Sequence, residues 1–253
     1  MALIRLDHVS KNIGVNTPVN IILPDPGRMK DIPVRNRKVL YLLHGLSDDA
    51  SAWQRYSSVE TYANDHGLVV VMPSAGRSFY SDQPNGQKYF SYLVDELPQY
   101  LADVFHLQPS RVNTFIAGNS MGGYGAFKVA FLRPEKFHAA LSLSGVLSLA
   151  IVNQHDDQRR PEFEHLFGDL SQLPGSQLDP AIWIKNAVQN KVDLPKLFIA
   201  CGKQDDLYPL SQYFYAACQA AGFDVHYQEE DAQHDWYYWD KMIRWFIEEV
   251  ISS

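Results

Sequence analysis

The chain has 253 residues, of which 46% are hydrophobic and 20% are charged, enough for one globular domain with a large core. Its formal net charge of -7, without any block rich in lysine or arginine, argues against nucleic acid or an anionic membrane surface as the main partner. No apolar stretch approaches the roughly 20 residues that span a bilayer, and the first residues lack the layout of a secretion signal, so we expect a soluble, cytoplasmic protein with no membrane partner.

The amino-terminal part of the chain predicts strands before the first helix. Residues 3–9 and 15–23 have the pattern of two early antiparallel strands, and residues 24–36 form a polar loop with prolines. Residues 39–43 are a continuous apolar run, which is typical of a strand buried on both faces. The next predicted elements are a helix over residues 59–66, a strand over residues 68–72 and a helix over residues 90–105.

The pentapeptide Gly118-Asn119-Ser120-Met121-Gly122 is the most informative motif of the chain. An isolated Gly-x-Ser-x-Gly occurs by chance in roughly one chain in ten of this length. Here, however, it lies between an apolar, β-branched run and a helix pattern rich in glycine and alanine. This placement predicts a nucleophile elbow, the sharp strand-to-helix turn that exposes a serine hydroxyl, with glycines where the backbone is strained. The motif therefore predicts a serine hydrolase.

Beyond a buried strand over residues 139–143, the regular pattern is interrupted. Residues 147–192 contain clustered charges and several prolines, and we interpret them as a helical cap insertion over the carboxyl edge of the sheet, forming one wall of a pocket. Because strand and helix patterns alternate elsewhere, we expect an α/β fold in a single domain over residues 1–253, with a mostly parallel central sheet and helices on both faces. The later elements are a strand at 196–200, a helix at 209–221, a strand at 223–228 and a helix at 236–250.

The two cysteines do not predict a disulfide. Cys201 lies in an apolar strand pattern and Cys218 in a helical pattern. We expect both to be small buried hydrophobic residues, in keeping with the expected cytoplasmic location.

The elbow requires an acid later in the chain, because the catalytic residues of α/β-hydrolases follow in the order serine, acid, histidine. Asp205 lies in the loop after the strand at 196–200, which is the expected position. Asp206 is its rival, with capping of the following helix as the alternative role. Asp231 is a third carboxylate, but it precedes the predicted histidine in the same loop, where solvation is expected. We favour Asp205.

His234 lies in the loop before the terminal helix, where the catalytic histidine is expected. It would remove the proton of Ser120 during attack on an ester carbonyl and return it to the leaving alcohol, while Asp205 fixes the imidazole tautomer. The other eight histidines occupy poorer positions, and His44 has a structural role in this interpretation; they are His8, His44, His66, His106, His138, His155, His165 and His226.

A tetrahedral intermediate needs at least two donors for its negative oxygen. One is the backbone N–H of Met121, which directly follows the nucleophile. The second is expected from the loop His44-Gly45-Leu46 after the early buried strand, where Gly45 permits a turn that aims the Leu46 N–H inward. Loss of one such donor typically costs about a hundred- to a thousandfold in rate.

The segments 44–46, 118–125, 202–205 and 234–239 together resemble the bacterial tributyrin esterases. The likeness covers nearly the whole chain, including residues 79–82 and 96–98, and is weakest in the insertion. These enzymes belong to an esterase-D-like group that also includes S-formylglutathione hydrolases, some feruloyl and acetyl-xylan esterases, and mycolyltransferases. The resemblance implies an α/β-hydrolase fold and hydrolysis of short-chain acyl esters, such as tributyrin, acetyl or aryl esters, with no cofactor and no metal. It places the triad on Ser120, Asp205 and His234 and the oxyanion donors on Leu46 and Met121.

The substrate is less well defined by the sequence. Candidates for an aromatic pocket suited to short acyl groups are Trp53, Phe79, Tyr80 and Trp236, with Tyr124 and Tyr237 beside them in the chain. Residues 47–50 lack the cysteine expected in the formylglutathione branch, which disfavours a thioester substrate without excluding it. The alternatives are a feruloyl or carbohydrate acetyl esterase, a thioesterase, an acyltransferase and a catalytically silent binding protein. A small-molecule ester is the expected partner, and a homo-oligomer is left open.

Overall fold

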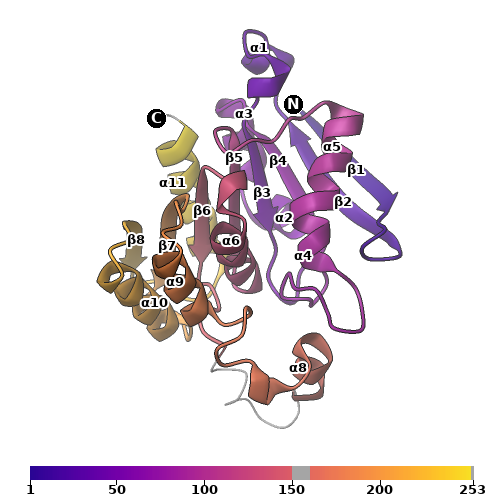
Figure 1. Cartoon of the computed structure of the whole chain (residues 1–253). Coiled ribbons are helices and arrows are strands. Elements are labelled where there is room, and N and C mark those ends of the chain that lie inside the picture. The colour runs from indigo at the N-terminus through magenta and orange to yellow at the C-terminus, as the bar shows by residue number, and fades with distance from the viewer. Residues whose placement is uncertain (150–159, 252–253) are drawn as a thin grey trace.

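The computed structural model describes residues 1–149 and 160–251 (Figure 1). The strands of this part form one eight-stranded sheet in the order β1-β2-β4-β3-β5-β6-β7-β8. β1 pairs antiparallel with β2, and β2 with β4, whereas all other neighbours are parallel. The strands are β1 (Ala2–Val9), β2 (Asn16–Leu23), β3 (Val39–Leu43), β4 (Val69–Pro73), β5 (Thr114–Asn119), β6 (Ala139–Leu143), β7 (Lys196–Gly202) and β8 (Val225–Glu230).

The strand order changes direction at β3. The chain continues from β3 to β4 on one side and then crosses to β5 on the other. In an open parallel sheet, such a switch point leaves a crevice outside the carboxyl ends of the two strands. Leu43 at the end of β3 pairs with Gly118 near the end of β5, so the residues that follow these two strands lie side by side.

The central strands are buried on both faces, as their continuous apolar sequences predict. Every residue of β3, β4, β5 and β6 is buried. In β3 the side chains alternate between two hydrophobic clusters: Val39, Tyr41 and Leu43 belong to one, and Leu40 and Leu42 to the other. A parallel sheet whose strands are buried in this way needs a helical layer on each face.

The two helical layers match these two clusters (Figure 1). One face is covered by α5 (Leu97–Phe105), α6 (Met121–Leu132), α9 (Pro180–Gln189) and α10 (Tyr208–Ala220). The other is covered by α2 (Ala52–Tyr56), α3 (Val59–Asp65) and α11 (Trp236–Ile251). The other described α-helices are α1 (Pro26–Met29), α4 (Tyr89–Ser91) and α8 (Arg160–Phe167), and the described 3₁₀ turns are Val34–Asn36, Pro134–Lys136 and Leu170–Gln172.

The mostly parallel sheet with helices on both faces confirms the predicted α/β-hydrolase architecture. One predicted helix differs in detail. The segment 90–105 is helical, but a π-helical turn at Tyr92–Glu96 separates α4 from α5. Pro98 lies in the first turn of α5, and it has no N–H to continue the bonding pattern of an uninterrupted α-helix through that point. The apolar, β-branched run before the Gly-x-Ser-x-Gly motif is a strand only from Thr114, and this strand extends to Asn119.

Of the proposed cap insertion at 147–192, residues 147–149 and 160–192 are described, and residues 150–159 lie outside the described part of the chain. α8 lies at one end of the molecule, at the bottom of Figure 1. α9, in contrast, packs against α6 and α10 and belongs to the layer that covers the sheet. Trp183 of α9 is buried against Tyr124 and Phe131 of α6.

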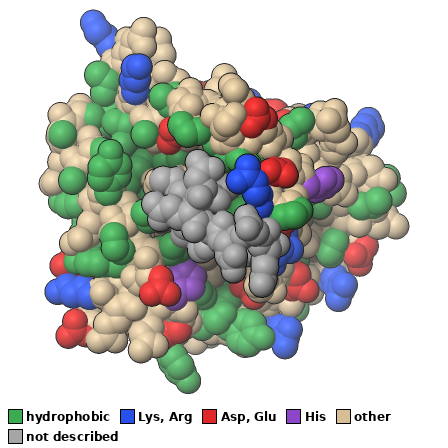
Figure 2. All heavy atoms as spheres, turned by 90° about the horizontal axis from the view of Figure 1, so that it is seen from below, with side chains coloured by type: hydrophobic (Ala, Val, Ile, Leu, Met, Phe, Trp, Pro, Cys, Tyr) green, Lys and Arg blue, Asp and Glu red, His purple; other side chains and the backbone are tan. Residues whose placement is uncertain are grey.

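Two further expectations can be compared with the structure. Cys201 and Cys218 are both buried and free, which confirms that they do not form a disulfide. Within residues 1–149 and 160–251, no helix combines the length and apolarity needed to cross a membrane. The face that carries α8, seen from below in Figure 2, mixes hydrophobic side chains with acidic and basic ones.

Candidate active site

Ser120 occupies a strained turn between β5 and α6. Its backbone has φ 54° and ψ -116°, a conformation that residues other than glycine rarely adopt. A Cβ on Gly118 would lie 2.5 Å from the Gly122 carbonyl group, and one on Gly122 would lie 2.5 Å from the Leu43 carbonyl oxygen. Only glycine fits at either position, so the motif has the geometry of a nucleophile elbow.

Backbone hydrogen bonds hold this turn in place. The N–H of Ser120 donates to the carbonyl of Leu143 at 2.8 Å, which ties the elbow to the end of β6. The Ser120 carbonyl accepts from the N–H of Tyr124 at 3.1 Å and from that of Val146 at 3.4 Å. Strain at a non-glycine residue persists when the surroundings fix it in this way, and it concentrates at functional sites.

Asp205 and His234 form a hydrogen-bonded pair. Nδ1 of His234 lies 2.8 Å from Oδ2 of Asp205, whose side chain is fully buried, while the His234 side chain is 35% exposed. Because a carboxylate can only accept, the proton of the neutral imidazole is on Nδ1, and Nε2 is left free to act as a base. Asp206 and Asp231, the two rival carboxylates, are both exposed.

Gly202 allows the loops that carry Asp205 and His234 to approach each other closely. The N–H of Gln204 donates to the carbonyl of Ala232 at 3.0 Å, and that of Lys203 donates to Glu230 at 2.8 Å. A Cβ on Gly202 would lie 2.2 Å from the Ala232 carbonyl oxygen. The approach of the loop after β7 to the loop after β8 therefore depends on the missing side chain at Gly202.

The charge of Asp205 is stabilised by hydrogen bonds. Burial alone would raise the pKa of this carboxyl, but hydrogen bonds from His234, from the Ser144 hydroxyl and from the Leu207 N–H hold its pKa below the ordinary value. The Leu207 N–H donates to Oδ1 at 2.8 Å. Asp205 therefore remains a carboxylate and can stabilise a positive imidazolium.

Ser144 is a site residue that sequence reasoning missed. It directly follows β6, is fully buried, and has a positive φ of 46°. Its Oγ accepts from Nε1 of Trp239 at 3.0 Å, and the Trp239 ring meets the His234 ring edge-on at 4.8 Å. Ser144 thus links the acid to the residue that supports the histidine. The available signal was a small polar residue directly after a buried strand.

Ser120 and His234 follow the carboxyl ends of β5 and β8 in the same parallel sheet. Ser120 is bonded to Leu143, next to Ser144, which in turn faces the Asp205 carboxylate. Between the described residues, no hydrogen bond joins the Ser120 hydroxyl to the His234 ring. Catalytic hydrogen bonds are often long without substrate and tighten when it binds.

The predicted oxyanion donors lie next to the elbow. Met121 is the first residue of α6, where the helix offers no carbonyl to its N–H. A Cβ on Gly45 would lie 3.7 Å from Cβ of Ser120, so the His44-Gly45-Leu46 loop runs past the serine. In the described part of the chain, the Leu46 N–H donates to no other group. Both N–H groups are therefore available to a bound oxygen.

The four aromatic pocket candidates have different positions. Trp53 is buried, and its Nε1 donates to the Leu43 carbonyl at 2.9 Å. Tyr80 is 1% exposed, and its hydroxyl donates to the His44 carbonyl at 3.0 Å. These two polar groups bind backbone carbonyls at the end of β3 and directly after it. Trp236 is partly buried and meets the Trp53 ring edge-on at 4.9 Å.

Phe79 connects the elbow to α8. Its N–H approaches Sδ of Met121 at 3.3 Å. Its ring lies edge-on to the Phe163 and Phe167 rings of α8, with centroid distances of 6.2 and 5.5 Å, and to that of Tyr124 at 5.7 Å. The Phe79 backbone therefore touches the first residue of α6, while its buried ring packs against α8 and Tyr124. Tyr237, in contrast, is 91% exposed.

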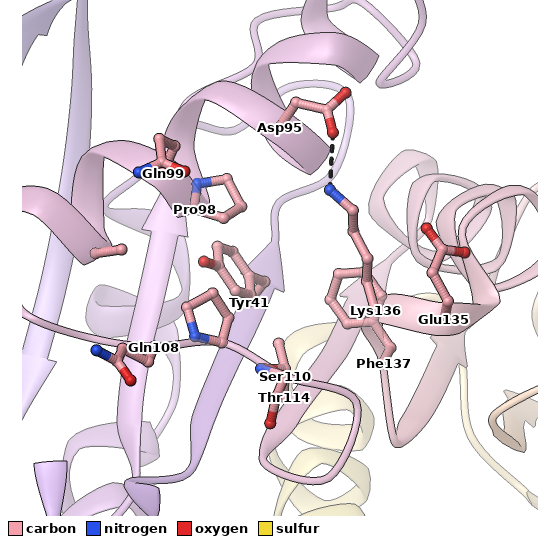
Figure 3. Close-up of a pocket in the computed structure, with 12 residues that line it drawn as sticks. Tyr41, Asp95, Pro98, Gln99, Gln108, Ser110, Thr114, Glu135, Lys136 and Phe137 are labelled. Atoms are coloured by element: carbon pink, nitrogen blue, oxygen red, sulfur yellow. Dashed lines mark hydrogen bonds and ion pairs between the residues drawn. The ribbon is translucent and has the colours of Figure 1, made fainter. Parts of the chain in front are cut away.

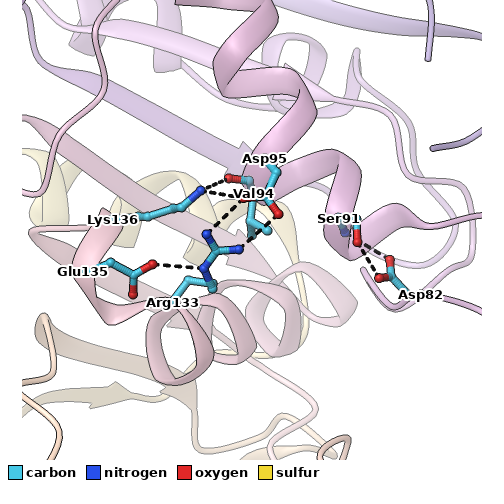
Figure 4. Close-up of polar contacts among 7 residues, drawn as sticks. All are labelled: Asp82, Ser91, Val94, Asp95, Arg133, Glu135 and Lys136. Carbon is cyan, nitrogen blue, oxygen red and sulfur yellow. Dashed lines mark hydrogen bonds and ion pairs between the residues drawn. The ribbon is translucent and has the colours of Figure 1, made fainter. Parts of the chain in front are cut away.

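A separate groove of about 380 Å³ (Figure 3) lies at the amino ends of the parallel strands, whereas Ser120 lies at their carboxyl ends. The groove is bordered by Thr114 at the start of β5 and by Phe137 before β6. Its charged rim is internally paired: Asp95 contacts Lys136 at 2.7 Å and Arg133 at 3.0 Å (Figure 4). The groove contains none of the predicted site residues.

The described residues contain no cluster of three or more side chains suited to a metal ion.

The chain is similar to known esterases over most of its length. Residues 10–245 match the family model described as "Putative esterase". The chain is 32% identical to an acetyl esterase of Caldicellulosiruptor saccharolyticus over 96% of both sequences.

Two solved structures from Staphylococcus aureus are similar over nearly the whole chain. One is a fluorophosphonate-binding serine hydrolase in its substrate-bound form, with a TM-score of 0.91 and 35% identity over 100% of this chain and 99% of that one. The other is an S-formylglutathione hydrolase, with a TM-score of 0.89 and 35% identity over 99% and 98% of the two chains. The chain therefore belongs to the esterase family whose model matches residues 10–245. It is a carboxylesterase of the serine hydrolase type with the α/β-hydrolase fold.

Proposed function

We propose that the protein hydrolyses short-chain acyl esters through a triad of Ser120, His234 and Asp205. The observation that carries the proposal is the strained Ser120 at the end of β5, on the same sheet edge as a histidine bonded at 2.8 Å to a fully buried carboxylate. A serine hydroxyl is a weak nucleophile until an adjacent base accepts its proton. Nε2 of His234 is the free imidazole nitrogen that supplies this base.

The reaction proceeds in two steps. Oγ of Ser120 attacks the ester carbonyl carbon while Nε2 of His234 takes its proton, and the C–O bond to the leaving alcohol then breaks as the imidazolium returns that proton. Water next attacks the acyl-enzyme with His234 again as the base, which releases the carboxylic acid and restores Ser120. Asp205 stabilises the imidazolium in both steps because its carboxylate stays charged.

The negative oxygen of each tetrahedral intermediate would be bound by the N–H groups of Leu46 and Met121. The Met121 N–H also begins a twelve-residue helix, whose amino-terminal field favours negative charge. Such donors act without reorganisation because the fold holds them in place before substrate arrives.

The closely packed aromatic rings beside the nucleophile elbow favour a small acyl group. The Phe79 N–H contacts Sδ of Met121, and the Phe79 ring packs against two phenylalanines of α8, which makes these surroundings apolar and closely packed. The similarity to an acetyl esterase supports short acyl chains, of the tributyrin, acetyl or aryl ester kind. A thioester is the second candidate, because one of the two similar structures is named S-formylglutathione hydrolase. The absence of a cysteine from Ser47-Asp48-Asp49-Ala50 favours the oxygen ester.

Labelling with a fluorophosphonate, combined with a substrate panel, tests the proposal. The native protein should bind the probe covalently at Ser120, and Ser120→Ala should not. Turnover should be highest for p-nitrophenyl acetate or butyrate and fall with longer chains, and oxygen esters should exceed S-formylglutathione in kcat/KM. Labelling of Ser120→Ala, or wild-type turnover by that variant, would refute the assignment; preference for the thioester would replace the substrate class alone.

A further inference from the structure

Two hydrogen bonds to the Gly45 carbonyl oxygen fix the peptide bond between Gly45 and Leu46. The Gly45 carbonyl oxygen lies 2.7 Å from Nδ1 of His44 and accepts from the Asp48 N–H at 3.2 Å. In a planar trans peptide, the carbonyl and the following N–H point in opposite directions, and the described chain contains no cis peptide. Fixing the Gly45 oxygen therefore fixes the direction of the Leu46 N–H, away from these partners.

The proton of His44 is placed by a second backbone bond. Nε2 of His44 accepts from the Ala75 N–H at 2.9 Å, so this nitrogen carries no proton. Nδ1 is then the protonated nitrogen and donates to the Gly45 carbonyl. Burial lowers the pKa of His44, which keeps the ring in this neutral form. A buried imidazole of defined tautomer thus holds the Gly45–Leu46 peptide.

Tyr80 fixes the preceding peptide. Its hydroxyl donates to the carbonyl of His44 at 3.0 Å, and its own carbonyl accepts from Nζ of Lys128 at 3.3 Å. The Tyr80 backbone has a positive φ of 47°, and its ring occupies space that a Cβ on Gly125 would enter at 2.5 Å. Contacts to its backbone carbonyl and to its ring thus fix the position of Tyr80. Its hydroxyl in turn holds the loop after β3 in place.

We propose that Tyr80 and His44 are positioning residues that fix two consecutive peptides and so aim the Leu46 N–H at the developing oxyanion. This inference rests on the proposed role of Leu46 in the ester hydrolase. Neither side chain touches the substrate: both act through the backbone of the loop. Because the Leu46 donor is needed most when negative charge develops, weaker positioning lowers kcat while KM stays nearly unchanged.

Tyr80→Phe tests this inference, because it removes one hydroxyl and keeps the ring against Gly125. For p-nitrophenyl acetate we expect kcat to fall about tenfold or more, less than the loss of a whole donor, and KM to change less than twofold. The second readout is an aryl trifluoromethyl ketone, whose carbonyl carbon bonds to Oγ of Ser120 while the serine proton moves to His234, leaving a negative oxygen on the inhibitor. Its inhibition constant should rise by the same factor as kcat falls.

Tyr92→Phe is the matched control. Tyr92 is also 1% exposed, and its hydroxyl shares a 2.9 Å hydrogen bond with His8 of the edge strand β1. Both variants should lower the melting temperature similarly, but only Tyr80→Phe should change kcat and inhibitor binding. Wild-type kcat and inhibition in Tyr80→Phe, or equal effects of the two variants, would overturn the inference. The proposed function would stand in that case as long as Ser120→Ala is inactive and unlabelled.

Discussion

The Asp205 side chain shows how a single residue is prepared for its role. It is fully buried, and burial of a carboxylate costs several kcal/mol unless hydrogen bonds compensate. Here the donors are the His234 ring, the Ser144 hydroxyl and the Leu207 N–H. Asp206, the neighbour with the same chemistry, is exposed and has no part in this arrangement.

The two carboxylates should therefore respond very differently to the same substitution. Asp205→Asn removes the charge that stabilises the imidazolium and disturbs the Nδ1–H tautomer of His234, and we expect kcat for p-nitrophenyl acetate to fall about ten-thousandfold. Asp206→Asn should retain activity within about twofold. Steady-state kinetics of both variants measure this, and a larger loss in Asp206→Asn would assign the acid role to Asp206.

At the scale of residues, the sequence predicts the positions of Ser120, Asp205 and His234, because each follows a strand pattern in a known order. The structure brings Asp205 and His234 together at 2.8 Å. Ser144 could not be predicted in the same way, because its role depends on β6 lying next to β7 in the sheet. The local sequence pattern does not show which distant strands pair. The hydroxyl of Tyr80 and Nε2 of His44 likewise acquire their partners only through tertiary contacts.

At the scale of elements, glycines decide how closely the segments of the site approach. Gly118 and Gly122 let α6 turn tightly off β5, and Gly125 gives room to the Tyr80 ring. Gly202 has the same function between two loops, where a Cβ would lie 2.2 Å from the Ala232 carbonyl oxygen. Because that obstacle is backbone, it cannot move aside as a flexible side chain would.

Gly202→Ala should therefore separate the acid from the histidine without touching either. A displacement of about 1 Å in a catalytic group can cost about a hundredfold in rate, and we expect a kcat loss of that order with covalent fluorophosphonate labelling slowed in proportion. Gly27→Ala is the control, since a Cβ at Gly27 meets nothing within 4 Å. Wild-type kcat in Gly202→Ala would show that the spacing of the two loops is not critical.

The limits of prediction at this scale have physical causes. Long apolar runs such as β3 and β4 were identified with their bounds nearly correct because burial on both faces leaves a continuous signal. The π-turn before α5 was missed because helical periodicity persists through it. The prolines and charges of residues 147–192 obscure the helical pattern of α9, whose packing against α6 and α10 is fixed only by tertiary contacts.

At the scale of the whole molecule, one buried cation stands out in the described chain. Lys128 lies in α6 between the sheet and the surrounding helices, 3% exposed. Its Nζ donates to Oγ of Ser81 at 2.6 Å and lies 5.1 Å from the centre of the Phe90 ring. Burial lowers its pKa to about 7, although the nearby charge of Asp82, which is bonded to Ser91 (Figure 4), acts in the opposite direction.

This lysine makes the stability of the fold depend on pH. Between about pH 7 and its ordinary pKa of 10.5, the unfolded chain holds a proton on Lys128 that the folded chain does not hold. Stability rises with pH wherever the unfolded state binds more protons, so Lys128 should add about 2 kcal/mol to the free energy of unfolding between pH 7 and pH 9. The buried thiols Cys201 and Cys218, with pKa values raised to about 12, act in the opposite direction above the ordinary thiol pKa.

Because the thiols contribute equally to both proteins, the comparison of wild type with Lys128→Met isolates the lysine. Urea denaturation at pH 7, 8 and 9 should show the stability of the variant relative to wild type falling by about 2 kcal/mol from pH 7, where removing the proton from the buried lysine costs most, to pH 9. Lys185→Met, at an exposed position of α9, should follow the wild-type pH dependence. If the difference between wild type and Lys128→Met is constant across this range, the folded protein must hold Lys128 charged throughout, with Asp82 and the two neighbouring oxygens compensating its burial.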